Sequence, residues 1–360
     1  MSVQPEDIVR SGPNRYICQD GILKNFAEFI EGFTNPTIVT GFKSYQAFID
    51  YVEAVPNNVT VIQHDGYSSP KAIKDIASKV SQADVIIGIG GGIILDTAKS
   101  VADQLEIEFM TIPTVAGTCA AATPLSAIYT PDGAFLKVAY HTNSSSLTLI
   151  DPAFLINAPI TYLKSGIGDT LAKWYEAEAI IRYAADEKAQ SLMVQAGLNQ
   201  SVYLRDILLE DGNQAVKSSE RGEVTPAFTK VIEAIIMLSG TVGGFAGRYG
   251  RIAGAHAIHN GLSYINETHH ILHGHKVAYG ILVQLAIEKR VDEITSLVDF
   301  YTQLDFPTKF TDLGITTNQT KARNIIAEHA INPKESLQLM GDFSTKDVII
   351  ALDYLENNFR

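Results

Sequence analysis

Residues 84–99 read DVIIGIGGGIILDTAK, and this stretch decides the fold. Its first part, 84–89, is a nearly continuous apolar run, as expected for a parallel strand that is buried on both faces. A cluster of glycines follows, and then a run with helical spacing. Glycines here let the backbone approach a pyrophosphate, and the next helix presents its free amides and positive dipole end to it. The stretch therefore predicts a strand–turn–helix unit that binds a dinucleotide.

The spacing of the glycines departs from the common dinucleotide fingerprint. A G-x-G-x-x-G motif that begins at Gly88 requires glycine at position 93, where the chain has Ile93. A tight turn without a ligand therefore stays open as an alternative. Asp96 and Lys99 follow on the first turns of the helix, where a helix cap and a solvated charge are the alternatives to cofactor contacts.

Outward from this unit, short β-rich runs alternate with helical runs through the first 150 residues. The strands that we expect are 37–40, 59–62, 84–89, 108–112 and 147–150, with helices at 44–53 and 70–81 and a hairpin at 127–138. Such alternation predicts a doubly wound parallel sheet.

The second half of the chain has helical spacing almost throughout. The helices that we expect are 172–185, 187–210, 225–242, 252–263 and 277–287, with an exposed polar loop at 211–225. We therefore predict an α/β domain over 1–160 and an all-helical domain over 161–360. A ligand is expected in the cleft between them.

Composition excludes several classes of protein. The chain has 28 Lys+Arg against 40 Asp+Glu, a net charge of −12, so nucleic acid is not an expected partner. No apolar run reaches the ~18 residues of a membrane helix, and the first residues do not form a signal peptide. The cysteines, Cys18 and Cys119, fit a reducing cytoplasm better than a disulfide framework. We expect a cytoplasmic protein, a homo-oligomer (dimer or higher), that acts on a small molecule.

Histidines cluster in one short segment. Six of the nine lie between residues 256 and 275: His256, His259, His269, His270, His273 and His275. His256 and His259 are three residues apart on an expected helix and share a face. A metal site needs a further ligand, often a carboxylate. Asp169 could supply it, although after Gly166 and Gly168 it could equally be the N-cap of a helix.

Five segments taken together resemble one family: 90–99, 113–118, 166–172, 256–261 and 273–280. They are similar, in this order, to motifs of the group III, iron-containing type alcohol dehydrogenases, in the branch that includes glycerol dehydrogenase. Within that branch the stretches 118–121, 169–177 and 277–284 look like a bacterial hydroxycarboxylate dehydrogenase, an enzyme type that reduces 2-oxo acids with NAD(P)H. The resemblance implies a dehydroquinate synthase-like fold, with an α/β dinucleotide-binding domain followed by an all-α metal-binding domain.

The resemblance also implies roles for single residues. Asp169, His256 and His273 match three ligands of one divalent metal, and His259 lies beside it as a proton relay or, more simply, as a support. Together with the glycine turn, it assigns these contacts to NAD(P): Gly41, Gly90, Gly91, Gly92, Ile93, Asp96, Lys99, Thr114, Gly117, Thr123, Leu125 and Tyr129.

Three departures from the family pattern bear on metal, substrate and cofactor. Lys173 stands where many relatives have a fourth, histidine ligand, which favours Zn²⁺ with an open position over Fe²⁺. Cys119 replaces an aspartate of the glycerol branch, and with Lys173 and Arg251 it favours a 2-oxo acid as substrate. Gly41 stands where relatives that prefer NAD have an aspartate, and Lys43 follows, so we expect NADPH to be accepted at least as well as NADH.

Three other functions remain open at this stage. A glycerol dehydrogenase, which oxidises glycerol to dihydroxyacetone, is the first alternative, although its branch often carries an aspartate where this chain has Cys119. A lyase of the dehydroquinate synthase type would need a richer set of basic residues than Lys173, Arg248, Arg251 and Lys276. A nucleotide-sensing module without turnover would have lost its metal ligands, and all three are present.

Overall fold

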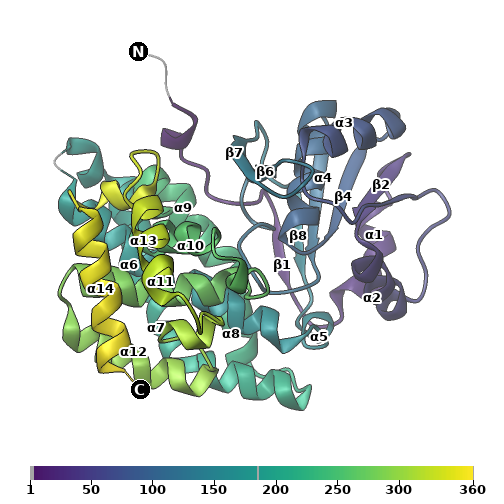
Figure 1. Cartoon of the computed structure of the whole chain (residues 1–360). Helices are drawn as coiled ribbons and strands as arrows, with labels where there is room; N and C mark the ends of the chain where they lie inside the picture. The colour runs from purple at the N-terminus through teal and green to yellow at the C-terminus, as the bar shows by residue number, and fades with distance from the viewer. Residues whose placement is uncertain (1–3, 185, 360) are drawn as a thin grey trace.

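The computed structural model describes residues 4–184 and 186–359. It has two halves: a sheet flanked by helices from the first part of the chain, and a bundle of helices from the rest (Figure 1). The last sheet strand ends at Ile150 and the first long helix of the bundle begins at Ile160. The predicted fold class, α/β followed by all-α, is confirmed.

The sheet has six parallel strands in the order β1-β8-β5-β4-β2-β3. They are β1 (Tyr16–Cys18), β2 (Pro36–Thr40), β3 (Thr60–Gln63), β4 (Val85–Gly90), β5 (Glu108–Pro113) and β8 (Leu147–Ile150). Every residue of β4 is buried, which agrees with its unbroken apolar sequence. The strand β1 has only three residues and was not predicted, because so short an edge strand leaves no periodic signal.

Helices cover both faces of the sheet. The short helix α1 (Phe26–Ile30) and α2 (Phe42–Val52) pack on one face, whereas α3 (Pro70–Lys79) and α4 (Gly92–Leu105) pack on the other. The neighbouring strands β2 and β4 therefore send their helices to opposite faces. The gap between their carboxyl ends is the switch point at which open α/β sheets bind ligands. The predicted hairpin also forms, from β6 (Leu125–Tyr129) and β7 (Phe135–Tyr140).

The second half is a bundle around one large apolar core. Its α-helices are α5 (Pro152–Leu155), α6 (Ile160–Tyr183), α7 (Leu192–Arg221), α8 (Pro226–Glu233), α9 (Ser239–Ala246), α10 (Gly254–Leu262), α11 (His273–Ile287), α12 (Val291–Leu304), α13 (Gln319–Ala330) and α14 (Thr345–Asn358). A π-helical turn, Ala234–Leu238, joins α8 to α9. Short 3₁₀ turns lie at Pro5–Asp7, Ile22–Asn25, Glu187–Gln190, Gly247–Gly250, Asn266–Thr268, Phe310–Leu313 and Ser336–Leu339.

Two predicted boundaries in this half are wrong. The expected loop at 211–225 is mostly helix, because α7 continues to Arg221. Gly212, Ala215 and Val216 are buried there, and a β-carbon at Gly212 would stand 3.3 Å from Phe300. Tertiary packing therefore overrides the low helix propensity of this polar, glycine-containing stretch. The other error is the start of α6, which lies at Ile160 rather than near 172.

One continuous helical stretch, Pro226–Gly250, is long and apolar enough by length and composition to cross a membrane, but two thirds of its most apolar 18 residues are buried inside the protein. Its apolar side chains belong to the core of the bundle, where Phe228, Ile232 and Val242 lie. Core packing accounts for the composition of this stretch.

The first described residues lie against the helical half before the chain enters the sheet (Figure 1). Two nitrogens of the Arg248 guanidinium donate to the Asp7 carboxylate, at 2.6 to 2.9 Å, and Lys188 donates to the same group at 3.1 Å. The amide of Arg10 then donates to the carbonyl of Gly244 at 3.0 Å. From there the chain crosses to β1.

Candidate metal and cofactor site

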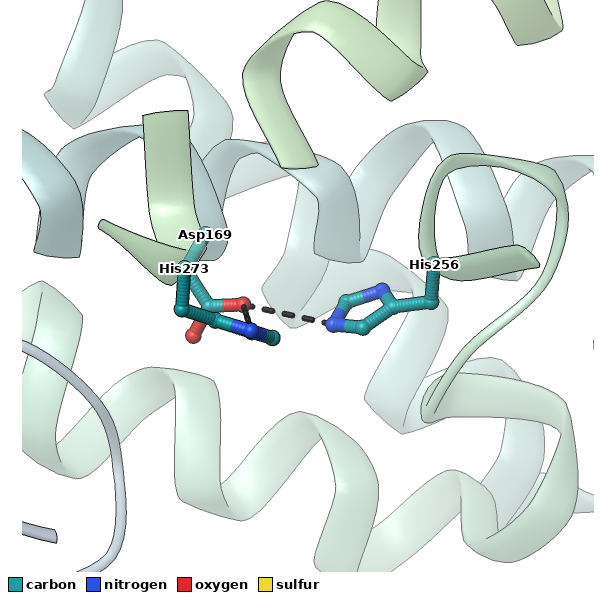
Figure 2. Close-up of side chains that lie close together, drawn as sticks. All are labelled: Asp169, His256 and His273. Carbon is teal, nitrogen blue, oxygen red and sulfur yellow. Dashed lines mark hydrogen bonds and ion pairs between the residues drawn. The ribbon is translucent and has the colours of Figure 1, made fainter. Parts of the chain in front are cut away.

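The three predicted metal ligands come together from three helices. Asp169 lies on α6, His256 on α10 and His273 at the start of α11, and their ligand atoms lie within 4.8 Å of one another (Figure 2). The Nε2 atoms of His256 and His273 lie 3.3 and 3.1 Å from Oδ1 of Asp169. One carboxylate oxygen and two imidazole nitrogens suit Zn²⁺ or Fe²⁺, and three protein ligands leave a coordination position open for substrate.

Asp169 lies in the middle of α6, nine residues after its start, so it is not a helix N-cap. Its side chain is 9% exposed. Burial alone would raise the pKa of this carboxyl, but the charges and hydrogen bonds of His273 and His256 outweigh it and hold the pKa well below its ordinary value. The group is therefore an anion, as a metal ligand must be.

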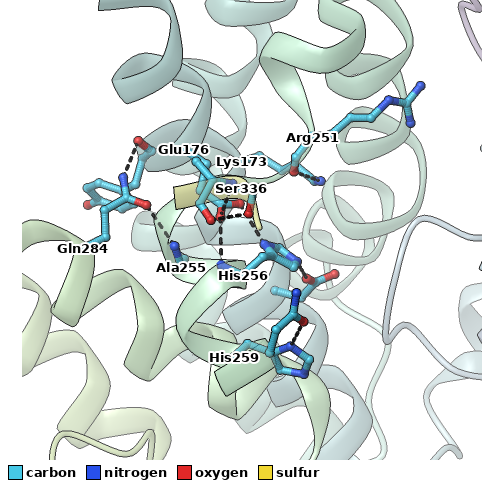
Figure 3. Close-up of polar contacts among 12 residues, drawn as sticks. Lys173, Glu176, Arg251, Ala255, His256, His259, Gln284 and Ser336 are labelled. Atoms are coloured by element: carbon cyan, nitrogen blue, oxygen red, sulfur yellow. Dashed lines mark hydrogen bonds and ion pairs between the residues drawn. The ribbon is translucent and has the colours of Figure 1, made fainter. Parts of the chain in front are cut away.

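Glu176 fixes the orientation and the tautomer of His256 (Figure 3). Its Oε1 accepts hydrogen bonds from the backbone amides of Ala253 and His256, at 2.7 and 2.9 Å. Its Oε2 lies 2.8 Å from Nδ1 of His256 and accepts a hydrogen bond from the N–H at that position. The proton of the ring therefore stays on Nδ1, and the Nε2 lone pair is left for a metal. Glu176 is fully buried, and it lies two helical turns beyond Asp169 on the same face of α6.

His273 has an equivalent support on its outer side. Its Nδ1 lies 2.9 Å from Nε2 of His259, whose own Nδ1 lies 3.0 Å from the Oδ1 of Asn260. An amide oxygen only accepts, so the proton of His259 sits on Nδ1, and Nε2 accepts the proton of His273 Nδ1. Asn260 is held by Glu335 at 2.8 Å. Burial, together with the charge of His273, lowers the pKa of His259 well below its ordinary value, which keeps this ring neutral.

The other clustered histidines do not join the site. His269 contacts the carbonyl of Ser263, and the ring of His275 packs edge-on against Phe306. His270 lies near Gly314. The count of six histidines thus overstated the site, of which His256, His259 and His273 are the members.

The predicted cofactor contacts gather at the carboxyl edge of the sheet. Gly41 follows β2, and Gly90, Gly91 and Gly92 lie where β4 turns into α4. Thr114, just after β5, donates its amide to the carbonyl of Gly90 at 3.1 Å, so the two turns lie side by side. A β-carbon at Gly91 would meet only Val115, at 3.5 Å, which leaves the turn open to a ligand. Ile93, on the first turn of α4, is 40% exposed.

Lys99 and Asp96 form a buried ion pair, so Lys99 is not a solvated charge. The Lys99 ammonium has no exposed surface, and it pairs with Asp96 at 2.9 Å. It also donates to the carbonyls of Ala120, Thr123 and Leu125. All of these partners of Lys99 belong to the protein, and the residue holds the loop that carries Thr123 and Leu125. Tyr129, at the end of β6, packs against the ring of Tyr67.

The cofactor edge and the metal ligands meet at α6. A β-carbon at Gly166 would stand 2.1 Å from the carbonyl oxygen of Ala116, in the loop that carries Thr114 and Gly117. One at Gly168 would stand 2.5 Å from the carbonyl oxygen of Gly274, next to His273. Only glycine permits both approaches, and Asp169 follows directly. The fold therefore places the loop beside the glycine turn and the candidate ligand triad on either side of one helix segment.

Residues 13–152 match the iron-containing alcohol dehydrogenase family. The hydroxycarboxylate dehydrogenase A of Escherichia coli is 38% identical over 287 residues, which are 79% of this chain and 78% of that protein. The chain belongs to this family. The glycerol dehydrogenase of Pseudomonas putida is 32% identical over 351 residues, 94% of each chain. The solved structure of glycerol dehydrogenase from Schizosaccharomyces pombe superimposes with a TM-score of 0.87 at 28% identity, over 97% of this chain and 90% of that one.

The predicted substrate residues of this iron-containing alcohol dehydrogenase are only partly brought together. The Lys173 ammonium, one helical turn beyond Asp169, donates to the carbonyl of Arg251 at 2.9 Å. Among the described residues it forms no ion pair with Asp169 or Glu176. The Arg251 side chain extends away from His256 and lies over the ring of Tyr140, 5.4 Å from its centroid (Figure 3). Cys119 is partly buried in the turn after β5.

Three residues that support the candidate ligands were not predicted from the sequence: Glu176, Asn260 and Glu335. The spacing of seven residues between Asp169 and Glu176 could have identified Glu176, because it places both carboxylates on one helix face. Asn260 and Glu335 meet only through the tertiary fold, and no local pattern connects them.

Proposed function

We propose that this protein reduces small 2-oxo acids to 2-hydroxy acids with a nicotinamide cofactor and a divalent metal, with Zn²⁺ favoured. The observation that carries the proposal is the approach of Gly166 to Ala116, because it sets the cofactor loop one helical turn from Asp169. When bound, the metal supplies a Lewis acid that polarises the C–O bond, and the nicotinamide supplies the hydride.

The chain's own residues prepare this chemistry. Glu176 and His259 hold the protons of the two ligand histidines on Nδ1, so both Nε2 atoms face the metal position. Lys99 holds the loop at 120–125 against α4, which keeps the cofactor edge in one conformation. Alignment of substrate and cofactor between the glycine turn and the triad is then the protein's contribution to the rate.

The choice of a 2-oxo acid rests on charge around the ligands. A carboxylate at position 119 would repel a substrate carboxylate at ~4 Å by roughly 1 kcal/mol in water and about 4 kcal/mol in a partly buried site, and Cys119 avoids this cost. Lys173 and Lys276 lie one helical turn beyond Asp169 and His273, and each is less than 10% exposed. Burial lowers the pKa of Lys276, which an anionic ligand nearby would offset.

Glycerol oxidation is the second candidate. Glycerol dehydrogenases match nearly the whole chain, as in the protein of Escherichia coli O6:H1, which is 33% identical over 96% of this chain. The Arg251 guanidinium lies over the ring of Tyr140. It therefore gives less support to binding of a 2-oxo acid carboxylate than the sequence suggested.

The deciding experiment measures oxidation of NADH and NADPH with 2-oxobutyrate, 2-oxoglutarate and a neutral aldehyde, and reduction of NAD(P) with glycerol, on samples of known metal content. We expect the 2-oxo acids to react faster than glycerol. Lys173→Ala should raise KM for the acids more than for the aldehyde, whereas Lys217→Ala, which removes an exposed lysine of α7, should change neither. Glycerol turnover without any turnover of 2-oxo acids would assign the protein to the glycerol dehydrogenases.

The protein is further expected to act as a homo-oligomer in the cytoplasm, with Cys18 and Cys119 as free thiols. Light scattering coupled to size exclusion measures the oligomeric state directly.

A further inference from the structure

Gly41 lies at the position that decides between NAD and NADP. It directly follows β2, at the switch point of the sheet, where a carboxylate that accepts the ribose hydroxyls of NAD would repel the 2′-phosphate of NADP. The sequence has no carboxylate at position 41, and for that reason it predicted good acceptance of NADPH. In the fold, a carboxylate from the loop after β3, that of Asp65, lies beside Gly41.

The side chain of Asp65 reaches this position from the neighbouring strand. A β-carbon at Gly41 would stand 3.4 Å from Oδ1 of Asp65, 3.6 Å from Oγ of Ser44 and 3.6 Å from Cγ1 of Ile94. The loop that carries Asp65 follows β3 and is held in place because the amide of His64 donates to the carbonyl of Thr40 at 2.8 Å. The carboxylate of Asp65 therefore lies directly beside the place of a side chain at position 41.

The backbone does not require glycine at position 41. Its φ is −88° and its ψ is 164°, which any residue adopts, and the contacts of an added β-carbon would be ordinary ones. Because position 41 has no side chain, the Asp65 carboxylate is the acidic group beside this turn, next to the first turn of α4. Asp65 is exposed, and no hydrogen bond or ion pair joins it to another described residue, so both of its oxygens are available to a ligand.

We propose that Asp65 accepts the hydroxyls of the adenosine ribose, and that the protein consequently binds NAD(H) in preference to NADP(H). The proposal rests on the proposed function, since it assumes that the glycine turn holds a nicotinamide dinucleotide. Lys43, on the first turn of α2, is the cation that would favour a 2′-phosphate. Asp65 opposes it, because a carboxylate and a phosphate dianion at about 4 Å repel each other twice as strongly as two single charges.

The test measures the dissociation constants of NADH and NADPH by fluorescence titration of the metal-loaded protein without substrate. The natural protein should bind NADH at least tenfold more tightly than NADPH. Asp65→Asn should move the ratio of the two constants at least tenfold toward NADPH. Asp50→Asn, at the far end of α2, removes the same charge and keeps an acceptor for Gln46, and it should leave the ratio unchanged.

A second, independent experiment moves the carboxylate from position 65 to position 41. Gly41→Asp alone would crowd two carboxylates at one point and should weaken the binding of both cofactors. Gly41→Asp combined with Asp65→Asn moves the single carboxylate across the gap and should restore the preference for NADH. An unchanged ratio in Asp65→Asn, or tighter binding of NADPH by the natural protein, would overturn the assignment of Asp65 while leaving the dehydrogenase function intact. If neither dinucleotide binds, the proposed function itself is wrong.

Discussion

Glu176 controls which nitrogen of His256 faces the metal. Its Oε1 accepts from two backbone amides, and its Oε2 accepts from Nδ1 of His256. These three hydrogen bonds use both oxygens of Glu176, and they hold its carboxylate in one orientation. A residue that touches no metal therefore determines whether His256 can be a ligand at all.

The variant Glu176→Gln tests this control. The two backbone amides should hold the glutamine oxygen in the place of Oε1, which turns the NH₂ group toward His256. The ring must then accept at Nδ1 and carry its proton on Nε2, where it blocks coordination. We expect metal affinity to fall by roughly 10- to 100-fold, as measured by competition with a chelator and by metal analysis. Glu210→Gln, at an exposed position of α7, serves as the control, and equal metal affinity in both variants would contradict the tautomer argument.

At the scale of elements, α6 is a helix whose start the sequence predicted poorly. The sequence left open that a helix begins only after Gly166 and Gly168, because glycine is unfavourable within one. In the fold they lie inside α6, where they let the backbone of the cofactor loop and of α11 come close. The strand–turn–helix at 84–99 was predictable because its signals are local. The course of α6 was not, because its glycines serve contacts with residues 50 and more than 100 positions away.

Gly166→Ala should separate the two halves of the site. The new β-carbon would lie 2.1 Å from the carbonyl oxygen of Ala116, which is backbone and cannot turn aside. Overpacking of this kind costs about 1–3 kcal/mol, so we expect a lower melting temperature and weaker cofactor binding, with the metal retained. Gly32→Ala, where an added β-carbon meets nothing within 4 Å, is the matched control. Equal melting temperatures and cofactor affinities for the two variants would show that the close approach is unimportant.

At the scale of the whole molecule, the candidate ligand triad joins Asp169 of α6 to His256 and His273 of α10 and α11, two consecutive helices much further along the chain. Asp169, His256 and His273 were predictable as ligands through their motifs, whereas Asn260 and Glu335 were not, since their contact depends on how α10 meets the 330–340 segment. The large apolar core around α6 and α11 forms from other residues. Folding and metal binding should therefore be separable.

His256→Ala and His273→Ala should remove the bound metal and most of the activity while the fold persists. Circular dichroism should match that of the natural protein. The melting temperature should fall to that of the natural protein stripped by a chelator, because both lose the same ligand-linked stabilisation. Full activity in a variant that contains no metal would rule out the triad as the catalytic site.

The ion pair between Asp7 and Arg248 attaches the first described residues to the helical half. Arg10 is bonded to the helical half, and Tyr16 already belongs to the sheet, so the chain crosses between the halves there and crosses again between Ile150 and Ile160. The halves also share packed apolar surface, because Leu95 and Ala121 of the first half belong to the same core as Ile167 of α6. Two chain crossings and a shared core together restrain movement of one half against the other, which fixes the distance between the glycine turn and Asp169.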